Sequence, residues 1–162
     1  MTKYESVFDS IGRELGTAVT VMDRDGTFVY VNDEMLRMYN TTSDELIGVN
    51  LSEMGLPDEM VEERMKLIRR VTDDGVECLV RSVWDGVQQF SWVRSVGGEA
   101  GEVPRVLAIT RRIGTGEEAD RLYESELPVL SSQFIELGEL EKISKRELEV
   151  LVLIGHGMST RE

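Results

Sequence analysis

The chain has 162 residues, of which 41% are hydrophobic, enough for one packed domain with an extension and too many for a disordered chain. Its net charge of −13 argues against a free-standing nucleic-acid-binding domain, because such domains neutralise phosphate with a basic face. There is no apolar run of membrane-helix length, no export signal, and only one cysteine, so we expect a cytoplasmic protein without membrane contact.

The first expected element is a helix over residues 4–15, which Gly16 ends. Its apolar residues fall at helical spacing, so it packs either on its own domain or against a second chain. A strand over Thr17–Met22 follows, and a hairpin should join it to a second strand over Phe28–Val31. Gly26 supplies the positive φ that the turn between them needs.

Two short helices should follow this hairpin. Asn32 ends the second strand and is a good N-cap for the first helix, which carries several apolar residues. Thr42 and Glu45 have the spacing of a capping box at the start of the second helix. Gly48 then ends that helix.

A longer helix should begin at Pro57, which suits the first helical position, and end at Asp74-Gly75. Its expected inward stripe consists of Val61, Met65, Ile68 and Thr72. Three antiparallel strands should follow, over Val76–Trp84, Gln88–Val96 and Val103–Ile113. Asp85-Gly86 is a strong signal for a tight hairpin between the first two of these strands.

The order of these elements resembles a PAS domain. The resemblance is carried by Asp25-Gly26, Tyr30-Val31-Asn32 and Glu45-Leu46-Ile47-Gly48, with the longer helix and the strands after them. It implies an α+β fold over residues 17–113, a five-stranded antiparallel sheet with helices on one face, and a flanking helix over residues 1–16. One departure is Arg112-Ile113-Gly114, where many PAS domains have Asp-Ile-Thr and couple the sheet to an outgoing helix.

PAS domains often enclose a small molecule, but the residues present argue against the common cofactors. Haem needs an axial ligand such as histidine, and the single histidine, His156, lies far outside residues 17–113. The Asn-Cys-Arg-Phe context of the flavin photoreceptors in this family is absent, and Cys78 is expected as a small buried residue of a strand. No residues have metal-ligand spacing, so we expect no cofactor and no metal.

An organic ligand in an apolar pocket is the remaining option. The residues expected to line such a pocket are Met22, Met35, Met38, Met54, Met65, Phe90 and Trp92. Flexible methionines could adapt to a ligand, and the aromatic pair could form a wall from the sheet. The alternative is that the methionines are plain core. Trp84 and Trp92 both stand at even-numbered strand positions, which suggests that they face the same side of the sheet.

Residues 114–142 are expected to form a helical connector. Thr115 and Glu118 have capping-box spacing at the start of a polar helix, which Pro128 interrupts. In sensors of the PAS type such a helix often pairs with its twin, so we expect a homodimer. The apolar seam on this helix is too thin for an independent coiled coil.

Residues 143–162 resemble the opening of a LuxR-type helix-turn-helix domain. Ser144 and Glu147 form a capping box for one helix, and Gly155 and Gly157 then break it. The resemblance is carried by Arg146-Glu147, Glu149-Val150-Leu151, Ile154, Gly157, Ser159 and Glu162. The match stops before the recognition helix, so we assign no DNA-binding residue and expect a truncated part of a longer regulator, with DNA contacted only by the missing segment.

The functional hypothesis is a PAS sensory and dimerisation module of a bacterial LuxR-type transcription regulator, which relays ligand or partner binding to a DNA-binding domain. The alternative is a ligand-free PAS module that acts in signal transduction through protein–protein interaction. The sequence has no nucleophile elbow and no phosphate loop, and His156 has no evident partner. We therefore expect no enzymatic activity and no catalytic residue.

Overall fold

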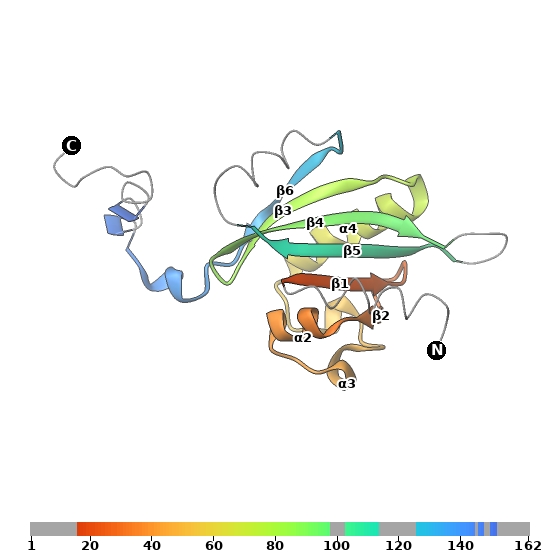
Figure 1. Ribbon diagram of the computed structural model, residues 1–162, viewed down its shortest axis with the longest axis horizontal. Coiled ribbons are helices and arrows are strands. Elements are labelled where there is room, and N and C mark those ends of the chain that lie inside the picture. The colour runs from red at the N-terminus through yellow and green to blue at the C-terminus, as the bar shows by residue number, and fades with distance from the viewer. Residues whose placement is uncertain (1–15, 98–102, 114–125, 145, 148–149, 152–162) are drawn as a thin grey trace.

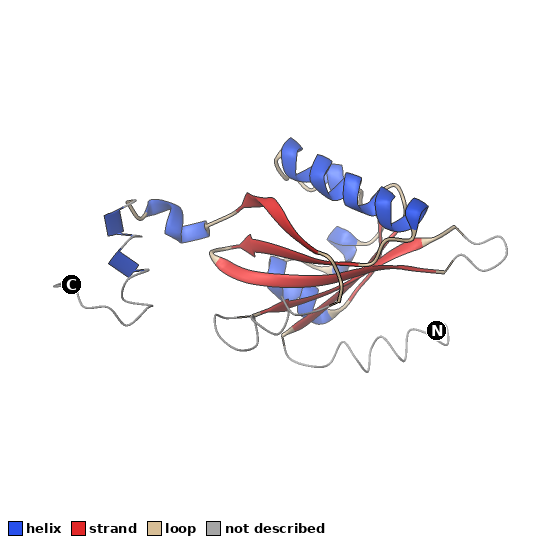
Figure 2. Cartoon of the chain, turned by 90° about the horizontal axis from the view of Figure 1, so that it is seen from above, coloured by secondary structure: helices blue, strands red, loops and turns tan. Residues whose placement is uncertain are grey.

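The computed structural model describes residues 16–97, 103–113, 126–144, 146–147 and 150–151. They form an α+β fold in which helices cover one face of a six-stranded sheet with the strand order β2-β1-β5-β4-β3-β6 (Figures 1 and 2). The strands are β1 (Thr17–Met22), β2 (Phe28–Val31), β3 (Cys78–Trp84), β4 (Val87–Val96), β5 (Arg105–Arg112) and β6 (Val129–Ile135). The helices are α2 (Asp33–Tyr39), α3 (Ser43–Leu46), η1 (Leu51–Glu53), α4 (Asp58–Asp74) and η2 (Gly138–Lys142).

The hairpin of β1 and β2 has the bounds expected from the sequence. In its turn, Gly26 has a φ of 87° and its amide donates a hydrogen bond to the Asp23 carbonyl at 2.9 Å. A Cβ on Gly26 would stand 2.7 Å from the Met65 sulfur, which packs over the turn from α4. Glycine is therefore needed here for its conformation and for the space it leaves.

Asn32 joins the first hairpin to α2. Its Oδ1 accepts hydrogen bonds from the Met35 amide at 3.0 Å, as an N-cap does, and from the Val19 amide of β1 at 2.9 Å. Its Nδ2 donates to the Thr17 carbonyl at 2.9 Å. The predicted N-cap is confirmed, and the same buried side chain also holds the start of α2 against β1.

The capping box of the second short helix and the long helix are also confirmed. The face of the long helix that is buried differs from the predicted one. Glu45 Oε2 accepts hydrogen bonds from the Thr42 amide and hydroxyl at 3.0 and 2.9 Å. Helix α4 starts one residue after Pro57 and ends at Gly75, whose φ is 65°. Its fully buried residues are Met60, Ile68 and Val71, so the inward stripe predicted from the sequence was displaced.

The β3–β4 hairpin has the predicted two-residue turn. Asp85 and Gly86 have φ values of 50° and 69°, as a type I′ turn requires. This turn pairs Trp84 with Val87 and Leu79 with Trp92, so even positions on β3 lie opposite odd positions on β4. Residues with even numbers on the two strands therefore face opposite sides of the sheet.

The core lies between the sheet and the helices. It is formed by the apolar residues that α2, α3, η1 and α4 direct toward one face, together with the sheet residues that meet them. Its buried members are Ala18, Phe28, Met35, Met38, Leu46, Leu51, Ile68, Val71, Cys78, Val80, Val93 and Val106. The other face of the sheet carries two smaller clusters, centred on Phe90 with Leu79 and on Val19 with Leu107.

Strand β6 corrects two predictions. It adds a sixth strand, parallel to β3, and it lies within residues 114–142, which we expected to form a helical connector. The Leu79 amide donates to the Pro128 carbonyl at 3.0 Å where the pairing starts. At its far end the Glu136 carbonyl accepts from the Gly86 amide at 3.1 Å. The exposed edge of β3 thus supplies partners that outweigh any local helical preference.

Several expected features lie outside the described residues: the helix over residues 4–15, the capping box at Thr115, and His156. The capping box of Ser144 is described, and there Glu147 Oε2 accepts from the Ser144 amide at 2.8 Å. Among the described residues, no helix is long and apolar enough to cross a membrane.

Candidate ligand-binding site

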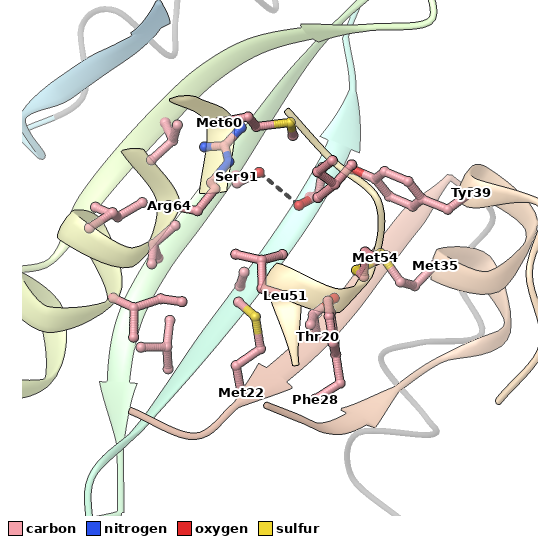
Figure 3. Close-up of a pocket in the computed structure, with 18 of the residues that line it drawn as sticks. Thr20, Met22, Phe28, Met35, Tyr39, Leu51, Met54, Met60, Arg64 and Ser91 are labelled. Atoms are coloured by element: carbon pink, nitrogen blue, oxygen red, sulfur yellow. Dashed lines mark hydrogen bonds between the residues drawn. The ribbon is translucent and has the colours of Figure 1, made fainter. Parts of the chain in front are cut away.

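A cavity of about 120 Å³ lies inside the domain, between the sheet and the helices that cover it (Figure 3). Strands β1, β3, β4 and β5 form its floor, and α4 forms the wall opposite. Helix α2 and the segment around η1 close the remaining side. Most of its lining is apolar, as is usual for a site that holds a small organic molecule.

Three of the five methionines predicted to line a pocket do line this cavity: Met22, Met35 and Met54. Met38 is buried in the core without reaching the cavity, and Met65 packs over Gly26 instead. The structure adds a methionine that the sequence reasoning missed, because Met60 lies on the true inward stripe of α4. The methionine side of the pocket was thus predicted in part.

Phe90 and Trp92 were predicted to form an aromatic wall of the same pocket, and this is wrong. Both lie on the opposite face of β4, in a cluster with Leu79, Ile113 and Val129. The β4 residues that line the cavity have odd numbers: Gln89, Ser91 and Val93. Trp84 and Trp92 also face opposite sides, since Trp84 stacks on Tyr39 of α2 with ring centroids 5.2 Å apart.

A small number of polar groups interrupt the apolar lining. Ser91 and Thr110 stand opposite each other on β4 and β5, with their hydroxyl oxygens 2.7 Å apart. The Gln89 amide donates a long hydrogen bond of 3.4 Å to the Tyr39 hydroxyl. From α4, Arg64 reaches toward the sheet on the side of Ser91 (Figure 3).

The position of Arg64 could have been recognised from the sequence if the inward face of α4 had been assigned correctly. The side of α4 that lines the cavity consists of Met60, Arg64, Leu67 and Ile68, a spacing of three and four residues. An arginine in the middle of an apolar stripe is a polar group placed where core is expected. No comparable pattern in the sequence indicated that Gln89, Ser91 and Thr110 would line the cavity.

Comparison with known families supports the fold assignment. The family described as PAS fold matches residues 13–117 of this chain. The chain belongs to the PAS-fold family. As a PAS domain it is a sensory module of the kind that signal-transduction proteins carry. The match ends at residue 117, so the LuxR-type resemblance of residues 143–162 stays a prediction.

Solved PAS structures share the architecture at low sequence identity. The PAS domain of BvgS from Bordetella pertussis is 17% identical, with a TM-score of 0.58 over 76% of this chain and 94% of that one. A sensory box sensor histidine kinase from Vibrio cholerae is 14% identical, with a TM-score of 0.54 over 70% and 94%. A domain of an HTR-like protein from Haloarcula marismortui is 17% identical, with a TM-score of 0.53 over 61% and 99%. No curated protein sequence matches the chain.

The cofactor chemistry of this PAS domain can be tested on its own residues. Cys78 is fully buried and is not part of the cavity wall, and burial raises the pKa of its thiol. A thiol held protonated in the core is a poor nucleophile toward a bound flavin. No group of histidine, cysteine or carboxylate side chains within the described residues could hold a metal ion.

Proposed function

We propose that this chain is the sensory and dimerisation part of a cytoplasmic, bacterial LuxR-type transcription regulator, and that a small organic molecule binds in its cavity. The observation that carries the sensory part is the largely apolar cavity of about 120 Å³ between the sheet and the helices. Protein interiors leave few voids larger than a water molecule. Four flexible methionines on its wall allow the cavity to fit a ligand more closely.

The assignment to a transcription regulator is supported by the residues at 143–162. The capping box at Ser144 and Glu147 fits the helix that opens a LuxR-type domain. In it the Ser144 hydroxyl donates a hydrogen bond to Glu147 Oε2 at 2.6 Å. The resemblance covers only this opening, so the proposal gives no base-contacting residue to the chain. The charge of −13 agrees with DNA contact being made elsewhere. The proposal includes no catalytic step.

Helix α4 is the element that would relay ligand binding. Arg64 and Leu67 line the cavity and also border a groove between α4 and β6. The preceding residue, Glu63, accepts a hydrogen bond from the Gln133 amide of β6 at 3.1 Å. A ligand that binds one position of α4 more tightly would therefore shift β6 and the chain that follows it. In a homodimer this shift would alter the spacing of the paired DNA-binding domains.

The first test is native mass spectrometry of the purified chain, set against its denatured mass. Added mass that is lost on denaturation supports a ligand-binding sensor. Replacing Ala108, which lines the cavity, by leucine should abolish the added mass. Ile109 is the matched control, because it lies on the opposite face of β5 and its change to leucine should leave the added mass in place.

The other outcomes separate the alternatives. A dimer without added mass that also fails to bind any compound in a screen supports an interaction module. A monomer under all conditions contradicts the dimer-based relay. The regulator assignment is tested by chromatin immunoprecipitation of the full-length protein in its own cell, where discrete enriched DNA sites are expected and uniform background would oppose it.

A further inference from the structure

The feature that defines the chemistry of the cavity is Arg64. It occupies the inward stripe of α4 between Met60 and Leu67, where the surrounding positions are apolar. It is the only charged residue among the described residues that line the cavity. The side chain is partly buried, which places the guanidinium in a medium where charge interactions are stronger than in water.

The guanidinium of Arg64 has no partner among the residues that the structure describes, neither a carboxylate nor a hydrogen-bond acceptor. Three other arginines are paired with carboxylates: Arg24 with Asp73 at 2.7 Å, Arg37 with Glu34 at 2.7 Å, and Arg105 with Asp23 at 2.8 Å. A partly buried cation without a partner is unfavourable, and the usual remedy is a carboxylate or phosphate in the geometry of the guanidinium fork. Arg64 lines the cavity and also borders the groove between α4 and β6.

The floor of the cavity can hold the second half of such a group. The Ser91 and Thr110 hydroxyls lie on the strand floor beneath Arg64, and only one of their two protons is used in their mutual 2.7 Å hydrogen bond. The other hydroxyl proton is free to point at an acceptor. Figure 3 shows Arg64 of α4 and Ser91 of β4 in the same part of the cavity, so an anion bound there would meet donors from the helix and from the sheet.

We propose that the cavity binds a small monocarboxylate with an apolar body. Its carboxylate would pair with Arg64 and accept from the Ser91–Thr110 pair, while its body would lie among Met22, Met35 and Met54. The inference rests on the proposed sensory function. A cavity of about 120 Å³ is close to the about 150 Å³ that holds benzene in an engineered protein, so the body is of that size.

The cavity can pair one negative charge, because Arg64 is the only charged residue among the described residues that line it. The groove on the outer side of α4 is lined by Glu59, Glu62 and Glu63 and equally by Arg64, Lys66 and Arg70, so it offers no excess positive charge to a second anionic group. Glu62 is paired with Lys66 at 3.7 Å, and Glu63 accepts a hydrogen bond from the Gln133 amide. The rest of the excess negative charge is screened beyond about 8 Å at physiological salt.

The experiment is isothermal titration calorimetry with benzoate and hexanoate, and with benzamide and hexanamide as neutral counterparts of the same shape. The dissociation constants of the carboxylates should be at least about tenfold lower than those of the amides, which is the usual gain from a hydrogen bond to a charged group. R64M keeps the apolar stem and removes the charge, so it should abolish this preference. R64K keeps the charge without the fork and should retain part of it.

The matched control is R69M, a change of an exposed arginine on the same helix that does not line the cavity, and it should bind as the wild type does. Equal binding of acids and amides would overturn the inference and leave the sensory function standing. Binding of neither class would also overturn it, and native mass spectrometry would then decide the sensory function by itself. Loss of preference in R69M as well as R64M would show a general charge effect and refute the assigned site.

Discussion

Replacing Asn32 by alanine should strongly destabilise the domain. The amide group bonds to three backbone groups of β1 and α2: the Val19 and Met35 amides at 2.9 and 3.0 Å, and the Thr17 carbonyl at 2.9 Å. Thr17 and Val19 are themselves buried, at 4% and 1% exposure. Their freed groups therefore have no ready access to water.

The magnitude follows from these contacts. Loss of an N-cap costs about 1 kcal/mol. Each buried backbone group left without a partner costs about 1–3 kcal/mol, and N32A leaves two of these in β1. The sum is about 3–7 kcal/mol, a large share of the about 5–15 kcal/mol that stabilises a typical domain. The melting temperature should fall by roughly 6–28 °C.

Urea unfolding followed by tryptophan fluorescence measures this loss, since Trp84 and Trp92 lie on the two faces of the sheet. N32D separates the parts, because it keeps the acceptor for Val19 and Met35 but sets an oxygen against the Thr17 carbonyl. N40G is the control: Asn40 is exposed, with a φ of 49° that glycine adopts readily, so its change should be nearly neutral. A loss below about 1 kcal/mol in N32A would refute the argument from unsatisfied buried groups.

Three further predictions follow from individual contacts. G26A should destabilise by about 1–2 kcal/mol in urea unfolding, because a side chain at a φ of 87° is strained and its Cβ would meet Met65; unchanged stability would contradict this. Hydrogen bonds from Thr42, and then Thr41, lower the pKa of Glu45 from its ordinary 4.5, so its stabilisation is present above that pH and lost as the pH falls below it. The stability difference between wild type and E45Q should therefore shrink on acidification, and a constant difference would refute it. The Cys78 thiol should react with a disulfide reagent only as fast as the domain opens, because the side chain is buried and its pKa is raised by that burial; fast labelling of the native chain would contradict it.

Local signals in the sequence were sufficient for the front of the domain. Gly26 as a turn residue, Asn32 as an N-cap and the Thr42–Glu45 box each have a local role that depends on residues only a few positions away, and the turn at Asp85-Gly86 selects its own conformation. Such features depend on backbone geometry that the residue type restricts directly. The backbone conformation at these positions is therefore set largely by local sequence.

The faces of the strands required one more step of reasoning. A two-residue turn at 85–86 makes paired residue numbers on β3 and β4 sum to an odd number, as in Trp84 with Val87. Even positions on the two strands must then face opposite sides. The placement of Phe90 and Trp92 could have been corrected from the sequence by this arithmetic, and so could that of Arg64 by testing every phase of the α4 stripe.

Strand β6 could not be foreseen in the same way. The segment VLSSQFI has weak alternation, and the register shifts between Arg81 and Val83 where β6 pairs with β3, which breaks its period of two. Its strand conformation depends on the free edge of β3, which is distant in sequence. From its own composition the segment was placed only as part of a helical connector, after the break at Pro128.

The anchoring of β6 decides how a signal could leave the cavity. Gly138 has a φ of 55° and packs against Asp85 of the β3–β4 turn. A Cβ at Gly138 would collide with the Asp85 carboxylate. G138A should therefore free the end of β6 from this turn. Amide hydrogen exchange of residues 129–136 should quicken while β1, β4 and β5 stay protected. G55A is the matched control, because Gly55 has a similar φ of 69° with nothing within 4 Å of its Cβ position. If exchange rises equally throughout the sheet, β6 is part of one cooperative unit and a local shift of α4 could not move it alone. Faster exchange confined to β6 would leave it as the separable element that a relay from the cavity requires.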